Sequence, residues 1–463
     1  MGIEKIPVVF TPDENFVVQT AVAILSMLET KEETTQYDFY IVVSEQMKVE
    51  NLAILERIRK IHLEFQYRIV FIETVRLDCQ KVTTRHLSTS AYYRLVLADV
   101  LKEDKCMYHD GDILVLEDLQ EMFHRNVQDV YVAGIKAIAK MQPTEENYNV
   151  MKKWNWQSFE QYILSGDLIF NLKKIREDGL VEKFYEQMEK EFPSEDQDVI
   201  NYCCYGKIDF LPLKFCVMNR WFCPNAFASM SRMVYGKEEL EEALKRPAVV
   251  HFAGADTKPW VNLRASYGRM WWKYAERILD LNEYQKWYER AKEYTLRRDW
   301  KHFIGQLPKD KKVIIFGFSK ISRQLFDAMK KHGIMVSCFA DNNSKVWGEV
   351  YENCGVMGIE SALESDSDCM VVIASQNFRE DIRKQLGKLG IPDEQMVDFY
   401  NKSYIYYMSI APECYGDELA DVYFREYGMD LTPIDAQKEL EKLSIEECNE
   451  LKEKYFMKYW MMP

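Results

Sequence analysis

The segment CMYHDGDILV, at residues 106–115, contains the residues best suited to chemistry, because Asp110 and Asp112 follow a strand-like apolar run. On an extended chain, positions i and i+2 point to the same side, so we expect both carboxylates to converge on one cation. Oxygen ligands of this kind select hard divalent ions such as Mg²⁺ or Mn²⁺, whose remaining positions are filled by substrate phosphate. Two further Asp-x-Asp triplets, at 196–198 and 366–368, lack this place at a strand end. The first triplet is therefore the candidate metal site.

Strand-like and helix-like runs alternate through residues 6–73. They are IPVVF, an apolar-periodic stretch from Phe16 to Thr30, YDFYIVVS, a helical stretch through Ile61, and YRIVFIE. This alternation predicts an α/β fold whose mainly parallel sheet is covered by helices on both faces. Ligands bind such sheets at the carboxyl ends of the strands, which is where Asp110 and Asp112 stand.

Length and composition bound the number of domains and the kind of partner. The chain has 463 residues, a net charge of −14 and a pI near 5.2. We expect two or three domains and no nucleic-acid partner, because phosphate binding needs positive charge. No apolar stretch reaches the roughly 18 residues of a membrane span, and the 11 cysteines form no CxxC pair. We therefore expect a cytoplasmic protein, soluble or peripheral at the inner face of the membrane.

Three further parts follow the first α/β domain, which we place at residues 1–262. Residues 263–308 predict a helical connector rich in aromatic and basic side chains, and five of the ten Trp fall within 260–300. We favour a helical pair packed between domains over a surface that seats in lipid headgroups. Residues 309–402 predict a second, Rossmann-like α/β domain, and residues 403–463 an acidic, helical tail.

The second α/β domain carries a degenerate form of the dinucleotide-binding fingerprint. The run IIFGFSKIS contains Gly317, but Ser319 and Ser322 replace the two glycines that would follow. The second of those glycines normally lets the backbone approach a pyrophosphate. Asp341 follows the next strand, where a ribose-binding acid would stand. Nicotinamide binding is therefore disfavoured, and docking, dimerisation or a small regulatory ligand is the favoured role.

Five ordered blocks within residues 6–260 resemble glycosyltransferase family 8, which includes bacterial lipopolysaccharide galactosyltransferases and glucosyltransferases as well as glycogenin. The blocks are VVFTPDENF, SAYYRLVLADVL, MYHDGDILV, SEDQDVIN with KIDFLPLKF after it, and VVHFAGADTKPW. The resemblance covers a little more than half of the chain. It implies a nucleotide-diphospho-sugar transferase (GT-A-like) fold with a mixed, mainly parallel sheet, and a retaining enzyme that moves galactose or glucose from a UDP-sugar.

The resemblance also implies roles for individual residues. Asp110, Asp112 and His251 would bind Mn²⁺ or Mg²⁺, and imidazole suits Mn²⁺. The residues that would bind the nucleotide sugar are Thr11, Asp13, Asn15, Arg94, Asp110, Gly254 and Lys258. Gln197 would face the anomeric carbon while Asp196 orients a hydroxyl group. Because Gln is a poor nucleophile, we favour front-face attack by the acceptor beside the departing UDP over a double displacement.

Several of these residues have simpler explanations. Asp13 and Asn15 are favoured N-cap residues and could cap a helix that starts near Phe16. His251 could be an ordinary histidine at a strand end, and Lys258 an ordinary solvated lysine.

Three positions depart from the family pattern on the side of the transferred sugar. Leu164 stands where family members often have Asn, and Ala137 where they often have Asp, so two polar contacts to the sugar are expected to be missing. Asp167 stands where an apolar residue is usual. It either compensates for these losses or is a polar residue at the edge of a loop.

We therefore expect a metal-dependent hexosyltransferase of bacterial surface polysaccharide or glycoprotein synthesis. Its partners would be a UDP-hexose donor and a glycan, lipid-linked or protein-linked acceptor, while peripheral membrane contact and a homo-oligomer stay open. Two alternatives remain. One is a nicotinamide-dependent sugar oxidoreductase or epimerase acting through the second domain, and the other is a non-catalytic protein that binds nucleotide sugars.

Overall fold

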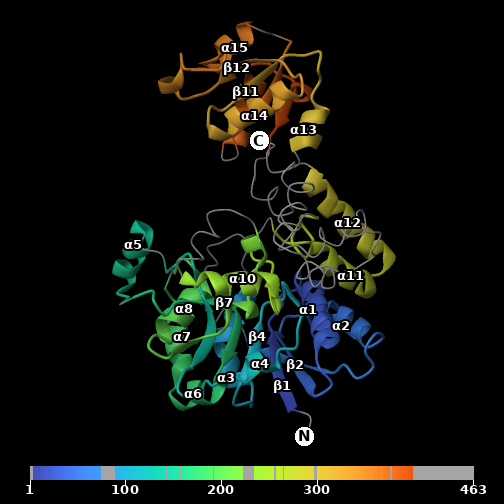
Figure 1. The fold of residues 1–463 in the computed structure, drawn as a ribbon, viewed down its shortest axis with the longest axis vertical. Helices are drawn as coiled ribbons and strands as arrows, with labels where there is room; N and C mark the ends of the chain where they lie inside the picture. The colour runs from blue at the N-terminus through green and yellow to red at the C-terminus, as the bar shows by residue number, and fades with distance from the viewer. Residues whose placement is uncertain are drawn as a thin grey trace. The chain divides into compact units, whose positions relative to one another are not determined.

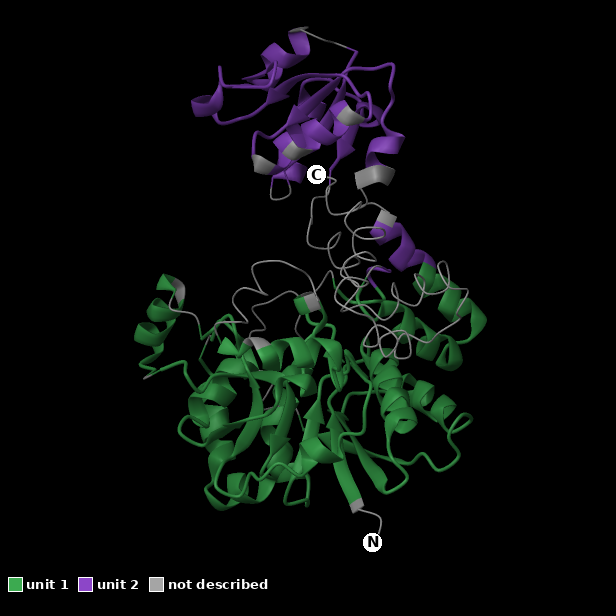
Figure 2. Ribbon diagram, in the orientation of Figure 1, with its two compact units in different colours: residues 1–260, 265–288, 413–438 green, residues 261–264, 289–412, 439–463 purple. Residues whose placement is uncertain are grey.

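A computed structural model describes residues 4–73, 89–141, 144–156, 158–190, 192–222, 234–254, 257–263, 265–296, 300–365, 368–375 and 378–399. The described chain forms two compact units, one from residues 4–260 with 265–288 and one from 261–263 with 289–399 (Figure 2). The predicted acidic tail, 403–463, and the first member of the 366–368 triplet lie outside the described residues. The division into four parts at 262, 308 and 402 stays a prediction.

The first unit is built on a seven-stranded sheet with the order β3-β2-β1-β4-β7-β6-β8 (Figure 1). The strands are β1 Glu4–Phe10, β2 Thr35–Ser44, β3 Tyr67–Ile72, β4 Cys106–His109, β6 Val132–Lys136, β7 Ile163–Phe170 and β8 Ile208–Phe210. Strand β1 is parallel to β2 and β4, β2 to β3, and β6 to β8, whereas β7 is antiparallel to β4 and β6. The predicted mixed, mainly parallel sheet is confirmed.

Helices cover this sheet and bury its apolar side chains. Val9 of β1 and Tyr108 of β4 belong to one apolar cluster with Phe184 and Ile200 from the covering helices. Val8, the neighbour of Val9 on β1, is also fully buried. Because successive side chains of a strand point to opposite faces, both faces of the sheet are covered here. The α-helices of this part are α1 Val17–Thr30, α2 Ala53–Ile58, α3 Leu97–Val100, α4 Gln120–Phe123, α5 Glu145–Trp154, α6 Leu172–Glu177, α7 Leu180–Met188, α8 Glu195–Cys203 and α10 Lys237–Lys245.

A second, three-stranded sheet positions the histidine of the candidate site. It has the order β5-β10-β9, from Ile113–Val115, Val249–His251 and Val217–Met218. Strand β10 is antiparallel to β5, and His251 pairs with Ile113. The last residue of β10 therefore lies beside the residue that follows Asp112.

The aromatic segment forms helices α11 Gly268–Ile278, α12 Leu281–Leu296 and α13 Trp300–Gln306. Trp271 is fully buried, 5.1 Å from Trp260 and 6.4 Å from Trp287 between ring centroids. The Trp272 indole is also buried and donates a hydrogen bond to Pro259 O. This packing agrees with the helical-pair explanation for these rings. No helix of the described chain has both the length and the apolar character to cross a bilayer.

The second unit is an α/β layer with the strand order β13-β14-β12-β11-β15-β16. Its elements are β11 Val313–Phe316, α14 Lys320–Lys331, β12 Val336–Ala340, β13 Val350–Tyr351, β14 Cys354–Met357, α15 Ile359–Ser365, β15 Met370–Ile373, α16 Arg379–Lys388 and β16 Met396–Asp398. All neighbours are parallel except β13 and β14. Ile315 packs with Leu325 of α14, and Ile314 packs with Leu386 of α16. Helices therefore cover both faces, and the expected α/β class is confirmed.

The residues of the degenerate fingerprint serve local structure in this unit. Ser319 and Ser322 form a reciprocal capping box at the start of α14. The two Asp341 oxygens accept hydrogen bonds from the backbone N–H groups of Phe318 and Asn343, at 2.7 and 2.8 Å. The Asp341 carboxylate thus has a structural role, in which each of its oxygens accepts a backbone hydrogen bond.

The packing of α11 makes a stability prediction. Trp271→Ala removes a fully buried indole, and deleting a buried Trp side chain costs about 3–5 kcal/mol of unfolding free energy. Chemical denaturation followed by circular dichroism measures the change. Leu281→Ala, at a side chain that is 70% exposed, is the matched control and should shift stability by less than about 0.5 kcal/mol. Equal effects of the two substitutions would contradict the packing described.

Candidate active site

Asp110, Asp112 and His251 converge at the point where the two sheets of the first unit meet. His251 Nε2 lies 3.3 Å from Asp112 Oδ1 and 4.0 Å from Asp110 Oδ2. One atom from each side chain lies within 4.8 Å of the others, which is the spacing of a metal-ligand set. The two carboxylates fit Mn²⁺ or Mg²⁺ in donor chemistry, and the imidazole nitrogen fits Mn²⁺ better than Mg²⁺, which prefers oxygen ligands.

The two carboxylates converge by a different geometry from the one we expected. The triplet is a bend between β4 and β5 and not a continuous extended strand. The Asp110 N–H donates to Gly166 O in the large sheet, at 2.8 Å, whereas the Asp112 carbonyl accepts from Phe252 N beside the small sheet, at 2.9 Å. The triplet therefore bends because its two ends are hydrogen-bonded to different sheets.

Two glycines that the sequence analysis did not select allow the close approach of these groups. A Cβ atom on Gly166 would lie 2.2 Å from His251 Cε1 and 2.9 Å from Asp110 Oδ2. A Cβ atom on Gly111 would lie 2.4 Å from Thr20 Oγ1 of α1. Real Cβ contacts are essentially never this short. The close packing around the three candidate ligands thus requires that neither position 111 nor position 166 carries a side chain.

Two cations balance the charge of the carboxylate pair. The Arg94 guanidinium is buried, lies 2.8 Å from Asp110 Oδ1, and stacks 4.5 Å from the centre of the Tyr108 ring. Lys258 Nζ contacts Asp112 Oδ2. Burial raises the pKa of Asp110, and Arg94 offsets that rise only in part. Burial also acts to raise the pKa of Asp112, but Lys258 and His251 outweigh it, so this pKa lies below its usual range.

Most of the residues predicted to bind nucleotide sugar line one pocket of about 340 Å³ beside the triplet. These are Thr11, Asp13, Asn15, Arg94, Asp110 and Lys258, with Phe16 and Asp112. Gly254 is not in the lining. It adopts a left-handed φ of 101° and accepts a hydrogen bond from Thr257 Oγ1 at 3.2 Å, which places it in the turn before Lys258.

The helix-capping explanation for Asp13 and Asn15 is wrong. Phe16 is the N-cap of α1, and no side chain in the described part of the chain makes a capping hydrogen bond there. Asp13 Oδ1 instead accepts a hydrogen bond from Asn15 N at 2.8 Å, and this local turn exposes both residues to the pocket. Lys258 is not an ordinary solvated lysine either, since its Nζ lies 5.3 Å from the centres of both the Phe16 and the Trp260 ring.

Asp196 and Gln197, predicted to act on the transferred sugar, lie in the first turn of α8. Asp196 is buried, with Oδ2 at 3.4 Å from Arg94 Nε, and burial raises the pKa of Asp196 to about 6. Gln197 Oε1 accepts from Ser165 N at 3.3 Å, and Gln197 Nε2 donates to Tyr162 OH at 3.1 Å. Arg94 therefore links Asp196 to Asp110, one of the candidate metal ligands. The side chain of Gln197 is held by Ser165 and Tyr162 instead.

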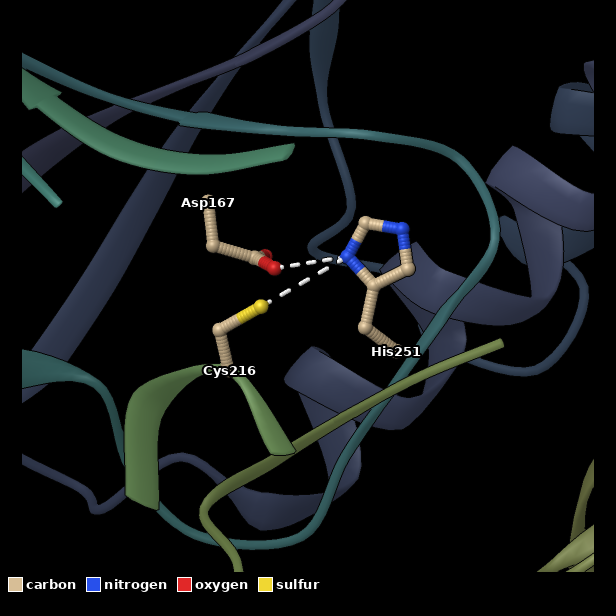
Figure 3. Close-up of side chains that lie close together, drawn as sticks. All are labelled: Asp167, Cys216 and His251. Carbon is tan, nitrogen blue, oxygen red and sulfur yellow. Dashed lines mark hydrogen bonds and ion pairs between the residues drawn. The ribbon is translucent and has the colours of Figure 1, made fainter. Parts of the chain in front are cut away.

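Asp167 is neither at a loop edge nor in the lining of the pocket. It is buried inside β7, where it pairs with His109 of β4 in the sheet register. Its two oxygens contact His109 Nδ1 at 2.7 Å and His251 Nδ1 at 2.9 Å. Figure 3 shows Asp167 and Cys216 on the Nδ1 side of the His251 ring. The signal that could have found it was one acidic residue inside the apolar run ILSGDLIF.

The two positions expected to lack sugar contacts belong to an apolar cluster. Ala137 is buried with Phe159 and Tyr162, and Leu164 packs against them. These side chains therefore have a packing role in the described structure.

Comparison with known proteins gives the family. Residues 7–264, more than half of the chain, match the sequence profile described as Glycosyl transferase family 8. The chain belongs to this family. The resemblance expected over residues 6–260 is confirmed, and this family 8 member is a glycosyltransferase. Residues 309–397 match a second profile, described as C2185-like, N-terminal.

Individual relatives agree with the family match. The chain is 27% identical over 264 residues to lipopolysaccharide 1,2-glucosyltransferase of Escherichia coli, covering 56% of this chain and 73% of that protein. The structure of galactosyltransferase LgtC superposes with a TM-score of 0.51 at 21% identity, over 62% of this chain and 100% of LgtC. The bifunctional glycosyltransferase WbbM has a TM-score of 0.51 at 22% identity, over 62% of this chain and 52% of its own. These similarities confirm the GT-A-like fold.

The close approach of His251 and Asp110 to Gly166 leads to a prediction for this glycosyltransferase. In Gly166→Ala the new Cβ must displace the His251 ring or Asp110, and such overpacking costs about 1–3 kcal/mol. Because the displaced groups are the candidate ligands, Mn²⁺ affinity should fall by about 10- to 100-fold, measured by titration calorimetry. Gly387→Ala, whose Cβ meets no atom within 4 Å, is the control and should bind Mn²⁺ like the parent protein. Parental Mn²⁺ affinity in Gly166→Ala would contradict the claim that a side chain at this position displaces the candidate ligands.

Proposed function

We propose that the protein is a metal-dependent, retaining hexosyltransferase that moves galactose or glucose from a UDP-hexose to a glycan or glycoconjugate acceptor, in bacterial surface polysaccharide or glycoprotein synthesis. The observation that carries the proposal is the convergence of Asp110, Asp112 and His251, of which the two aspartates line the pocket. The name of the Escherichia coli relative, a lipopolysaccharide glucosyltransferase, supports the same reaction class.

The pocket residues suit a nucleoside diphosphate. Asp13 and Asn15 offer polar groups for uracil and ribose, and Thr11 and Phe16 shape the slot in which the base would lie. Lys258 also lines the pocket, where it contacts Asp112, and would pair with the diphosphate. When bound, Mn²⁺ or Mg²⁺ supplies positive charge that offsets the negative charge developing on the leaving UDP.

The residues proposed to face the sugar favour front-face attack over a covalent intermediate. The amide of Gln197 is a poor nucleophile and is held by Ser165 and Tyr162. Asp196 is paired with Arg94 and suited to orienting a hydroxyl group. In the proposed step the acceptor oxygen bonds to the anomeric carbon as the bond from that carbon to the phosphate oxygen breaks. The acceptor proton passes to a phosphate oxygen of the departing UDP.

Release of UDP tests the proposed donor and metal directly. The purified chain should release UDP from UDP-galactose or UDP-glucose with Mn²⁺, faster with acceptor, and should stop when EDTA removes the ion. Asp112→Asn should lower the rate by more than about 100-fold, because a catalytic metal contributes several kcal/mol of charge stabilisation.

Asp368→Asn is the matched control, since Asp368 lies in the second unit, is exposed and pairs with Lys311 at the surface. It should release UDP at the parental rate. A parental rate in Asp112→Asn would disprove the metal assignment. Binding of UDP without any turnover would favour the non-catalytic alternative, and nicotinamide bound to the purified protein would favour the oxidoreductase.

The front-face hypothesis predicts that no sugar becomes attached to the enzyme. Intact-protein mass spectrometry during turnover of the UDP-sugar should give the unmodified mass, because no carboxylate is proposed to attack the anomeric carbon. A hexosyl adduct mapped to Asp196 or Asp198 would show a double displacement instead.

A further inference from the structure

Two histidines share one buried carboxylate behind the candidate metal site. Asp167 Oδ1 lies 2.7 Å from His109 Nδ1, and Asp167 Oδ2 lies 2.9 Å from His251 Nδ1. The relative exposures of His109, Asp167 and His251 are 0%, 1% and 7%. The three side chains come from β4, β7 and β10, so three strands of two sheets are connected by this group.

The two nitrogens of His251 face different partners. Nδ1 is directed at Asp167 and at Cys216 Sγ, which lies 3.7 Å away (Figure 3). Nε2 is the atom that lies 3.3 Å from Asp112 and 4.0 Å from Asp110. A hydrogen bond from Nδ1–H to Asp167 therefore leaves Nε2 as the nitrogen that can offer a lone pair to an ion held by the two aspartates.

We propose that Asp167 is a positioning residue that keeps the proton of His251 on Nδ1 and so presents Nε2 to the divalent ion. This inference rests on the proposed metal site at Asp110, Asp112 and His251. In metal sites generally, the ligating histidine donates its other ring N–H to a carboxylate or carbonyl, and loss of that partner weakens metal binding.

His109 explains why the bridging residue is a carboxylate. Asp167 can accept hydrogen bonds from the Nδ1–H of both histidines, one on each oxygen. An amide has only one acceptor oxygen, so Asn at this position would have to donate its N–H to one of the rings. That ring would then carry its proton on Nε2. In His109 this nitrogen is buried with no hydrogen-bond partner among the described residues, and in His251 it is the proposed ligand atom.

The same cluster could be taken for a second metal site, because ligand atoms of Asp167, Cys216 and His251 lie within 4.8 Å of one another. The contacts favour hydrogen bonding. Both Asp167 oxygens already contact a histidine Nδ1, and burial raises the pKa of the Cys216 thiol, which opposes formation of the thiolate that metals bind.

Asp167→Asn tests the proposal through the affinity for Mn²⁺ itself. Titration of the full chain with Mn²⁺ in the presence of UDP, followed by the electron paramagnetic resonance signal of the free ion, should show a Kd about 10- to 100-fold higher than that of the parent. UDP release by the variant should recover at saturating Mn²⁺, because the ligand is misplaced and not removed. A general loss of structure would not be rescued in this way.

Asp198→Asn is the matched control. Asp198 is also buried and accepts hydrogen bonds from Tyr162 OH and Ser194 N, away from the triplet. Its Mn²⁺ Kd should equal that of the parent. An unchanged Kd in both Asp167→Asn and Asp167→Ala, the second of which can make no side-chain hydrogen bond to either ring, would overturn the role of Asp167 while leaving the metal site intact. Absence of Mn²⁺ binding by the parent chain would overturn the metal site and this inference with it.

A measurement on the unsubstituted chain covers the case in which Asp167→Asn fails to fold. Nitrogen NMR of the histidine-labelled protein with Mg²⁺ and UDP, with His251 assigned from the signal lost in His251→Asn, should show a protonated Nδ1 and an unprotonated Nε2. An unprotonated Nδ1 on His251 would overturn the proposal.

Discussion

The site depends on the crossing of the chain from the seven-stranded sheet to the three-stranded sheet at Asp110-Gly111-Asp112. The amide of Asp110 is hydrogen-bonded to the first sheet and the carbonyl of Asp112 to the chain beside the second. Since His251 ends β10 in the second sheet, this crossing brings its imidazole to both carboxylates. The approach requires glycine at 166, where any side chain would collide with His251.

Charge balance is the second requirement of this arrangement. Two neighbouring carboxylates, one half-buried and one buried, are costly unless cations accompany them. Arg94 lies between Asp110 and Asp196, and Lys258 contacts Asp112. Both cations also line the pocket. The two cations that pair with the carboxylates in the protein alone are therefore also placed to pair with a diphosphate in the proposed complex.

The alternation of apolar runs predicted the sheet because strand and helix periods are local properties of the sequence. Asp110 and Asp112 were identifiable from their place after a strand, and His251 from the family blocks. The bend of the triplet was not predictable, since it follows from pairing between β5 and β10, which are far apart in the chain. Asp167 was misplaced for the same reason. Its role depends on the register that sets it opposite His109. An acidic residue within an apolar strand did indicate that Asp167 has a buried polar partner.

The most direct test of the account is a crystal structure of the chain with Mn²⁺ and UDP, with the ion located by anomalous scattering at the manganese edge. The account predicts one peak bonded to Asp110, Asp112 and the Nε2 atom of His251, with the UDP phosphates completing its coordination. A peak elsewhere, or a bound UDP with His251 turned away from both aspartates, would contradict it.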